Sequence, residues 1–236
     1  VSFFTKYYAS HLRSNQTGKV DILVGAFMFM SRKVYLEVGG FDENCFMYSD
    51  DIDLSYLVLQ KGKDNFFFFF TTVLHYKGES TIKDGAYMKR FQQAMRFFYQ
   101  KHFKVPFFFE LFMQIGIFFF SALKRIQGKS KKIKAPNHYL LLSSNDKLVE
   151  ELESVLGKKV VFRLFEGEKM VNSCLFKTNE NLEILLDNSH ISFKDCISIL
   201  ESLKNQGFTF KIIPKSSNFL IGSNNNNDIG TIIEIR

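Results

Sequence analysis

The sequence predicts an α/β protein built in two parts, and three observations support this fold class. With 236 residues, 46% of them hydrophobic and 23% charged, the chain has a globular composition and is long enough for one large or two modest domains. Strand-like and helix-like patterns alternate after residue 137, as they do in small domains with a partly parallel sheet. A polar, basic stretch at residues 127–136 separates the two parts and is the expected linker.

The first part, residues 1–104, is expected to combine strands with helices. Two apolar runs are typical of strands, residues 20–31 and 65–74. Three segments are expected to be helical, residues 32–38, 49–61 and 87–102. Local signals mark the helix ends, because Gly39 follows the first helix, Ser49 is a suitable N-cap for the second, and Gly62 stands at the C-terminal end of the second.

The last part, residues 137–236, is predicted to be a small Rossmann-like α/β domain. The expected strands are residues 138–143, 159–165, 182–186 and 209–213, and the expected helices are residues 146–156 and 193–205. This part contains neither G-x-G-x-x-G nor a P-loop, so a protein-interaction or regulatory module is the expectation.

The positive charge of the chain is concentrated where the two parts join. The formal net charge is +7, yet residues 1–137 hold 20 basic and 11 acidic side chains, while residues 138–236 hold 11 and 13. Residues 89–134 alone carry 11 basic side chains and one acidic side chain, Glu110. This asymmetry predicts a polyanionic partner, either nucleic acid or an anionic membrane surface.

Residues 105–136, between the two parts, are expected to hold a membrane-associated helix and a basic linker. Their aromatic segment, residues 107–123, favours the membrane. As a helix it would be about 25 Å long, short of the ~30 Å hydrocarbon core. A helix in the membrane interface fits this length, and the residues expected to bind the membrane are Phe108, Phe112, Phe119, Lys124 and Arg125. A buried core helix and a membrane-spanning helix are the alternatives. Nucleic acid is disfavoured, because the aromatic residues are contiguous and are not interleaved with the basic ones.

The cysteines indicate a reducing compartment. Cys45, Cys174 and Cys196 are odd in number and form no C-x-x-C pair, so neither a disulfide framework nor a zinc site is expected. No secretory signal opens the sequence. The first residue is Val and not Met, so we expect these residues to be a piece of a longer protein.

The densest polar cluster comprises Asp50, Asp51 and Asp53. Three carboxylates within four residues repel one another, which raises at least one carboxyl pKa and makes that group a better proton acceptor. Acids in the first turn of a helix also complement the helix dipole, so a purely structural role is the alternative. His75 follows the second apolar run and is either a hydrogen-bonded structural residue or part of a site loop.

Four motifs occur in order between about residues 15 and 103. They are Gly25-Ala26-Phe27-Met28, Gly39-Gly40-Phe41-Asp42-Glu43, the run FMYSDDIDL that starts at Phe46, and His75-Tyr76-Lys77-Gly78-Glu79-Ser80. Together they resemble the second half of bacterial family 2 glycosyltransferases with the GT-A fold, especially the rhamnosyltransferase-like group. The chain departs from the family pattern at Asp50, where Glu is usual, and at Leu57, where relatives commonly carry Arg.

The resemblance implies a role for each matching residue. Asp51 matches the catalytic base of the family. Asp50 would help to orient the acceptor, and Asp53 matches a third acid that is structural or faces the acceptor. Gly25 and Ala26 would line the acceptor pocket, where a small side chain leaves room for a sugar.

The implied reaction is an inverting sugar transfer. Asp51 would remove the proton of an acceptor hydroxyl while that oxygen attacks the anomeric carbon of a nucleotide sugar. Mg²⁺ or Mn²⁺ would offset the charge of the leaving diphosphate, and His75 matches a histidine that ligates this metal in some relatives. The family's first half, with its nucleotide-binding units and D-x-D metal motif, has no counterpart in this sequence. We therefore expect the chain to be inactive alone and to need that half for both the nucleotide sugar and the metal.

These expectations combine into one functional hypothesis. The chain would belong to a transferase at the cytoplasmic face of the plasma membrane, with a nucleotide-sugar donor, a glycan or lipid-linked acceptor and no nucleic acid partner. A non-catalytic membrane-docking or assembly scaffold, derived from a transferase, is the alternative.

Overall fold

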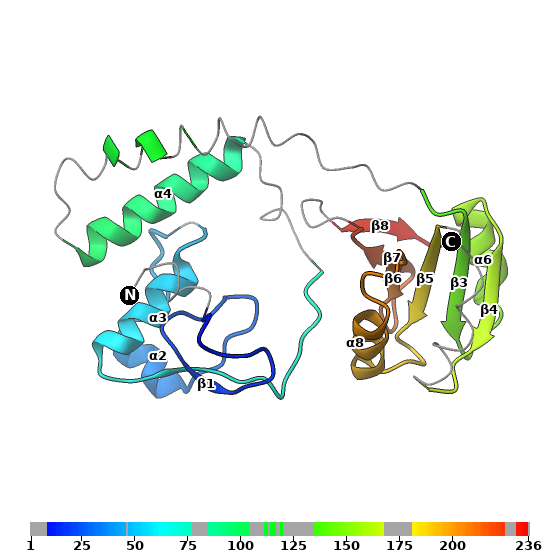
Figure 1. Cartoon of the computed structure of the whole chain (residues 1–236), viewed down its shortest axis with the longest axis horizontal. Coiled ribbons are helices and arrows are strands. Elements are labelled where there is room, and N and C mark those ends of the chain that lie inside the picture. Colours follow the sequence, from blue (N-terminus) through cyan, green and yellow to red (C-terminus); the bar gives the residue numbers. More distant parts are fainter. Residues whose placement is uncertain are drawn as a thin grey trace. The chain divides into compact units, whose positions relative to one another are not determined.

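The computed structural model describes residues 9–45, 47–76, 85–103, 111, 112, 114–116, 119, 135–167, 181–224 and 230–235. Contacts divide the mixed α/β chain into two units. The first unit comprises Val1–His75 and Lys83–Lys129, and the second comprises Tyr76–Ile82 and Ser130–Arg236. Figure 1 traces the elements of each unit along the chain.

Three helices of the first unit confirm the expectations from local sequence. They are α2 (Arg32–Val38), α3 (Asp50–Gln60) and α4 (Gly85–His102). Ser31 caps α2, because its side-chain oxygen accepts the N–H of Val34 at 3.3 Å. Gly39 ends the same helix in the left-handed conformation, with φ of 89°, where only glycine avoids a steric penalty.

The two strands expected in the first unit are much shorter in the structure than predicted. β1 (Gly18–Val20) pairs antiparallel with β2 (Asn65–Phe67), and the prediction of long strands at residues 20–31 and 65–74 is wrong. Each strand has one neighbour among the described residues, and the apolar residues beyond the paired stretch are exposed, with Phe29 at 92%. A strand needs a hydrogen-bonded neighbour along its length, and the apolar pattern alone does not supply one.

Helix α3 lies at the centre of the first unit's small core. On one side, Leu54 and Val58 pack against Val38 of α2. On another, Ile52 packs against Met95 and Phe98 of α4. The N-terminal turn of α3, where the acidic cluster lies, is therefore positioned by two other helices.

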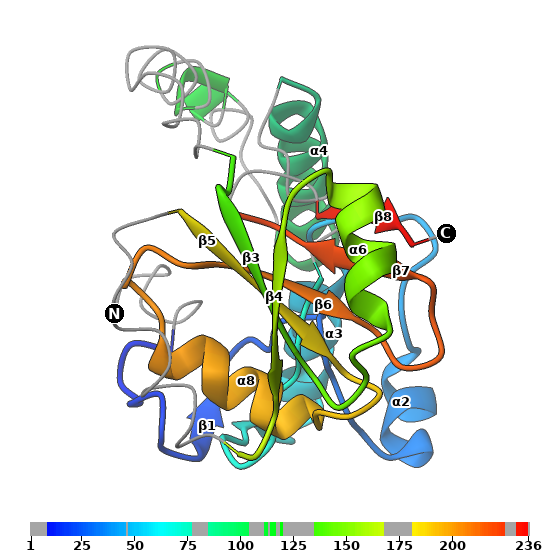
Figure 2. The same cartoon turned by 90° about the vertical axis from the view of Figure 1, so that its right-hand side faces the viewer.

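The second unit contains a six-stranded, mostly parallel sheet (Figure 2). Its strands are β3 (His138–Ser143), β4 (Val160–Leu164), β5 (Leu182–Asp187), β6 (Thr209–Ile213), β7 (Phe219–Gly222) and β8 (Thr231–Glu234). Their order is β4-β3-β5-β6-β7-β8, and the neighbours from β4 to β6 are parallel while β7 and β8 pair antiparallel. The strands β3 to β6 confirm the prediction, and β7 and β8 were not predicted.

Among the described residues, the helices that cover this sheet are α6 (Leu148–Leu156) and α8 (Phe193–Ser202). Figures 1 and 2 show them on opposite faces, as right-handed crossovers from β3 to β4 and from β5 to β6 require. Leu152 of α6 packs with Leu141 and Leu185 in a core from which water is excluded. Side chains alternate between the faces of a strand, so the buried Ile184 and Leu186 lie on the face that α8 covers.

Part of the predicted membrane segment is described, and that part is helical. Residues 111, 112, 114–116 and 119 have helical conformation, with Phe112 exposed by 73% and Phe119 by 62%. The other residues expected to bind the membrane, Phe108, Lys124 and Arg125, lie outside the described residues, as does most of the expected linker. Among the helices that the structure describes, none is both long and apolar enough to cross a bilayer.

Candidate functional site

The acidic cluster lies at the beginning of α3, and Ser49 precedes it as the residue at the N-cap position. Ser49 occupies the predicted N-cap position and is fully buried, but its side chain makes no capping hydrogen bond to the helix. Its φ of −130° and ψ of 2° differ from the extended backbone of a capping serine. The hydroxyl lies 3.0 Å from Sγ of Cys45, and the carbonyl accepts the N–H of Asp53 at 2.7 Å.

Asp51 is held by backbone N–H groups from two parts of the unit. Gly25 donates its N–H to Oδ2 at 2.8 Å, and Ile52 donates its N–H to Oδ1 at 2.8 Å. A Cβ added at Gly25 would lie 3.2 Å from Cβ of Asp51, a tight contact, so the missing side chain allows this approach. The structure thus brings together two residues that the sequence placed in one site, although 26 positions separate them.

The environment of Asp51 raises its carboxyl pKa. Burial is the largest cause, because it disfavours the charged form, and the negative charge of Asp50 acts in the same direction. The hydrogen bonds from Gly25 and Ile52 oppose the shift without cancelling it. The direction agrees with the expectation from sequence, but burial contributes more than the repulsion between carboxylates. A carboxylate of this kind is a better proton acceptor than an exposed one.

The other residues predicted near the acceptor differ in exposure. Asp50 is half-buried, whereas Gly25 and Ala26 are exposed in the segment that follows β1. Gly25 contacts Asp51 directly. Nothing in the structure tests whether Asp50 or Ala26 contacts an acceptor, so these roles stay predictions.

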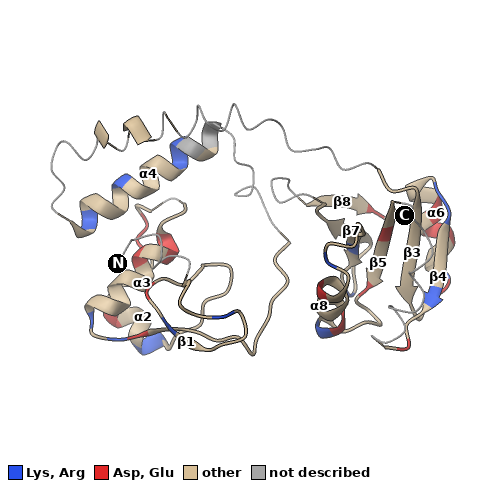
Figure 3. Cartoon of the chain, viewed as in Figure 1, with Lys and Arg blue, Asp and Glu red and all other residues tan. Residues whose placement is uncertain are grey.

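Asp53 forms a buried ionic cluster with the C-terminal end of α4. The residue is 1% exposed, its Oδ2 lies 2.8 Å from Nζ of Lys101, and its Oδ1 lies 2.5 Å from Nε2 of His102. Figure 3 shows acidic residues at the beginning of α3 and basic residues along α4. These contacts tie the first turn of α3 to α4. An acceptor role for Asp53 stays a prediction, and its observed partners are Lys101 and His102.

Lys101 joins two of the sequence motifs, because it also contacts Asp42 at 2.8 Å. The hydrogen bond from Lys101 is the main cause that lowers the pKa of Asp42 to about 2, with a further contribution from the N–H of Asn44. Burial by itself would lower the pKa of Lys101, but the two carboxylates outweigh that effect and raise it. The ammonium group therefore stays charged between the carboxylates of Asp42 and Asp53.

His102 lies in an aromatic setting that fixes its ring. The ring centroid is 4.6 Å from that of Tyr56 and 4.9 Å from that of Phe98. Sequence reasoning missed both Lys101 and His102, since it assigned the basic residues of this region to a polyanionic partner. A signal was available for His102 in the spacing, because it follows Phe98 by four residues and therefore lies on the same face of α4.

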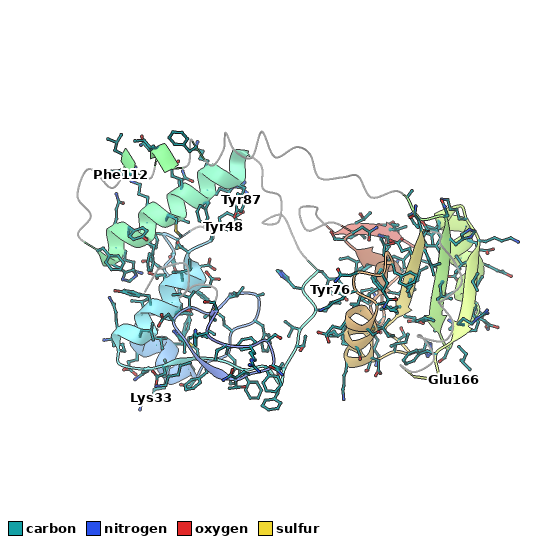
Figure 4. All side chains as sticks on the ribbon, in the orientation of Figure 1. Lys33, Tyr48, Tyr76, Tyr87, Phe112 and Glu166 are labelled. Atoms are coloured by element: carbon teal, nitrogen blue, oxygen red, sulfur yellow. The ribbon has the colours of Figure 1, made fainter. Side chains whose placement is uncertain are left out.

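Tyr48 precedes the acidic cluster in an unusual backbone conformation. Its φ is 71°, in the left-handed region that bulky residues rarely adopt. Its ring makes an edge-to-face contact with Tyr87 of α4, with the centroids 5.1 Å apart and the planes at 66° (Figure 4). Tyr48 belongs to the motif that starts at Phe46, and the sequence predicted no role for it.

The metal prediction rests on His75, which is exposed. Within the described ranges, no group of three or more His, Cys, Asp or Glu side chains is placed to hold a metal ion. His75 is therefore a single candidate ligand there, which is fewer than a divalent cation needs. The described residues do not form a metal site by themselves, and the prediction for His75 is untested.

Comparison with known proteins supports a relationship to glycosyltransferases over a short stretch. The chain is 38% identical over 67 residues to N-acetylglucosaminyl-diphospho-decaprenol L-rhamnosyltransferase from two Mycobacterium tuberculosis strains, CDC 1551 / Oshkosh and ATCC 25618 / H37Rv. The match covers 28% of this chain and 22% of each relative, so it spans about a fifth of the relatives' length. No family model matches the chain. No solved structure matches it either.

Proposed function

We propose that this chain is the acceptor-binding and catalytic half of an inverting family 2 glycosyltransferase. The enzyme would transfer a sugar from a nucleotide-sugar donor to a glycan or lipid-linked acceptor during synthesis of a cell-surface polysaccharide. The observation that carries the proposal is the half-buried carboxylate of Asp51, held by two backbone N–H groups beside Asp50. The short similarity to a rhamnosyltransferase supports the same class of reaction.

Asp51 would act as the general base. Each of its oxygens accepts one backbone hydrogen bond and keeps a further lone pair for a proton. The acceptor hydroxyl would give its proton to Asp51 while its oxygen bonds to the anomeric carbon of the donor. The bond from that carbon to the nucleotide diphosphate would break on the opposite face, which inverts the configuration. Asp50 would orient the acceptor by accepting a hydrogen bond from a neighbouring hydroxyl.

Donor binding would depend on a nucleotide-binding half that these 236 residues do not contain. A divalent cation, Mg²⁺ or Mn²⁺, would be held by that half and by the donor diphosphate, with His75 as one further ligand. When bound, the cation would offset the negative charge of the leaving diphosphate. The apolar side chains exposed in the first unit support this proposal, since exposed clusters of this kind mark interaction surfaces.

The decisive test is release of nucleoside diphosphate by the full reading frame that encodes these residues. We would supply a panel of nucleotide sugars and a lipid-linked acceptor, and compare wild type with Asp51→Asn. Loss of a general base is expected to slow turnover by about 10²–10⁴-fold. Asp64→Asn is the matched control, because the carboxylate of Asp64 is half-exposed and its ion-pair partner is the surface residue Lys19. Absence of release from every donor, with the protein folded, would favour the non-catalytic scaffold.

A second experiment tests whether the chain alone is inactive. Calorimetry with nucleotide sugars and Mn²⁺ should show no binding to the 236-residue chain. Micromolar, metal-dependent binding would contradict the proposed division between donor half and acceptor half.

We also propose that the helical segment around Phe112 binds the cytoplasmic face of the plasma membrane. The exposed side chains of Leu111, Phe112, Ile115 and Phe119 support this location, as does the excess of basic residues around them. The full chain should float with liposomes that contain anionic lipid, and Phe112→Ser with Phe119→Ser should reduce flotation. Lys33→Ser serves as a control, because it alters an exposed charge on α2, outside this segment. If the wild-type chain stays in solution with both neutral and anionic liposomes, the membrane proposal fails.

A further inference from the structure

We propose that Tyr48 and Tyr87 form an aromatic platform for the sugar ring of the acceptor, next to Asp50 and Asp51. This inference rests on the proposed function and names two residues that would decide which acceptor is bound. Neither residue takes part in the proton transfer proposed for Asp51.

The backbone of Tyr48 is the first observation. A tyrosine with φ of 71° is disfavoured by contact between its Cβ and the backbone, and such residues gather at functional sites. The strained position lies two residues before Asp50, at the entry to α3. A glycine or asparagine would adopt this conformation at lower cost, so the tyrosine side chain itself is the feature that offsets the strain.

The partner of Tyr48 comes from a distant part of the sequence. Tyr87 lies in the first turn of α4, and its ring stacks on Phe91 with centroids 6.1 Å apart and planes at 11°. The Tyr48 ring meets the Tyr87 ring edge to face at 5.1 Å (Figure 4). Both tyrosines are half-buried, so each ring is fixed by packing while part of its surface stays accessible.

The Tyr48–Tyr87 pair lies at the N-terminal end of α4. The opposite end of α4 is already tied to α3 by the contacts of Lys101 and His102 with Asp53. Met95 and Phe98 add apolar contacts to Ile52 in the middle and second half of the same helix. The Tyr48–Tyr87 pair fixes two rings at the other end of the helix, away from these contacts.

Aromatic rings beside carboxylates match the two kinds of surface that a carbohydrate offers. A pyranose ring has a face of C–H groups that packs on an aromatic surface, and its hydroxyls donate to carboxylates and bond to phenol oxygens. Asp50 and Asp51 supply the carboxylates, and Tyr48 and Tyr87 supply the aromatic surface. An acceptor ring on the tyrosines would lie beside the entry to α3, whose first turn carries Asp50 and Asp51.

The test is binding of simple sugars to the full 236-residue chain, because this step needs no donor. Saturation-transfer NMR with methyl glycosides of glucose, galactose, rhamnose and N-acetylglucosamine would report contact with individual ring protons. We expect at least one glycoside to receive saturation at its C–H face. Tyr87→Leu should weaken its binding by about three- to tenfold, the effect of one aromatic contact. Tyr87→Phe keeps the ring and should restore most of the saturation at the C–H face.

The controls separate this proposal from general loss of structure and from failure of the proposed function. Phe70→Leu removes another paired, exposed aromatic ring of the same unit and should leave sugar binding unchanged. Absence of binding by every glycoside, or unchanged binding in folded Tyr87→Leu and Tyr48→Leu, would overturn the platform. If the full reading frame transfers sugar and these two variants keep the wild-type KM for the acceptor, the platform is wrong and the transferase stands. If glycosides bind through the tyrosines and no donor is turned over, the transferase is wrong and the binding site stands.

Discussion

The first and second units build their cores differently. In the second unit, the central strands are flanked by strands and helices of the same unit, and Leu141, Leu185 and Leu186 are almost inaccessible to solvent. In the first unit, the described sheet has two strands, and large apolar side chains such as Phe29 and Phe70 are exposed. Isolated two-stranded sheets are marginally stable. The second unit therefore buries its apolar side chains in one core, whereas the first leaves large apolar side chains exposed and joins α3 to α4 partly through charged contacts.

The largest expected effect comes from breaking the ionic cluster of the first unit. Asp53→Ala would leave Lys101 without one of its two carboxylate contacts and the buried His102 without its carboxylate partner, so the unit should lose about 3–5 kcal/mol of unfolding free energy. Hydrogen exchange followed by mass spectrometry measures this, because peptides of α3 and α4 report on the first unit alone. Peptides of β5 should keep wild-type exchange. Glu43→Ala is the control, because it changes an exposed acid and should alter the unfolding free energy by no more than about 0.5 kcal/mol.

A cavity in the second unit should lower the unfolding free energy by a comparable or slightly smaller amount. The loss of hydrogen-exchange protection should then appear in the second unit and not in the first. Leu185 is fully buried between Leu141 and Leu152, so Leu185→Ala should cost about 2–5 kcal/mol. Urea unfolding with the same exchange readout should show the loss in β3 and β5 and not in α3. Val161→Ala, at an exposed position of β4, is the control. Equal loss of hydrogen-exchange protection in both units would contradict this predicted distribution.

The pH dependence of the first unit should reveal the contact of Lys101 with Asp42. The folded pKa of Asp42 is about 2, below its ordinary value of 3.8, so its carboxylate stabilises the fold fully above about pH 4. This contribution is lost as the pH falls through about 2. The difference in unfolding free energy between wild type and Asp42→Asn should therefore shrink on acidification. A difference that stays constant from pH 5 to pH 2 would show that the contact does not stabilise the unit.

The smallest effect should come from an ion pair of the same unit that solvent screens. Lys19 and Asp64 lie 2.7 Å apart, but their side chains are 66% and 49% exposed. Lys19→Met should change the unfolding free energy by about 1 kcal/mol or less. The unfolding free energies of Lys19→Met and Asp53→Ala should be compared with that of wild type at two salt concentrations. Added salt should remove the effect at Lys19 and should leave most of the effect at Asp53.

Local sequence was sufficient for the helices and for the parallel strands. The ends of α2 follow from Ser31 and Gly39, which act on backbone groups within a few residues. The strands β3, β5 and β6 were found because each contains a short apolar run, although Glu183 and Lys211 interrupt the apolar residues of β5 and β6. β7 and β8 were missed, since they are four residues each and their pairing is set by their neighbours.

In the candidate site, too, some features follow from local sequence and others only from the tertiary structure. The sequence alone determined that Asp50, Asp51 and Asp53 share one helical turn, and it placed Gly25 in the same predicted site. The tertiary structure decided that Asp51 is fixed by the N–H of Gly25, that Asp53 is buried against Lys101 and His102, and that Tyr48 meets Tyr87. The physical reason is the sequence separation over which each interaction acts. Capping and periodicity act between residues close in sequence, whereas burial, a raised pKa and an aromatic contact depend on groups that only folding brings together.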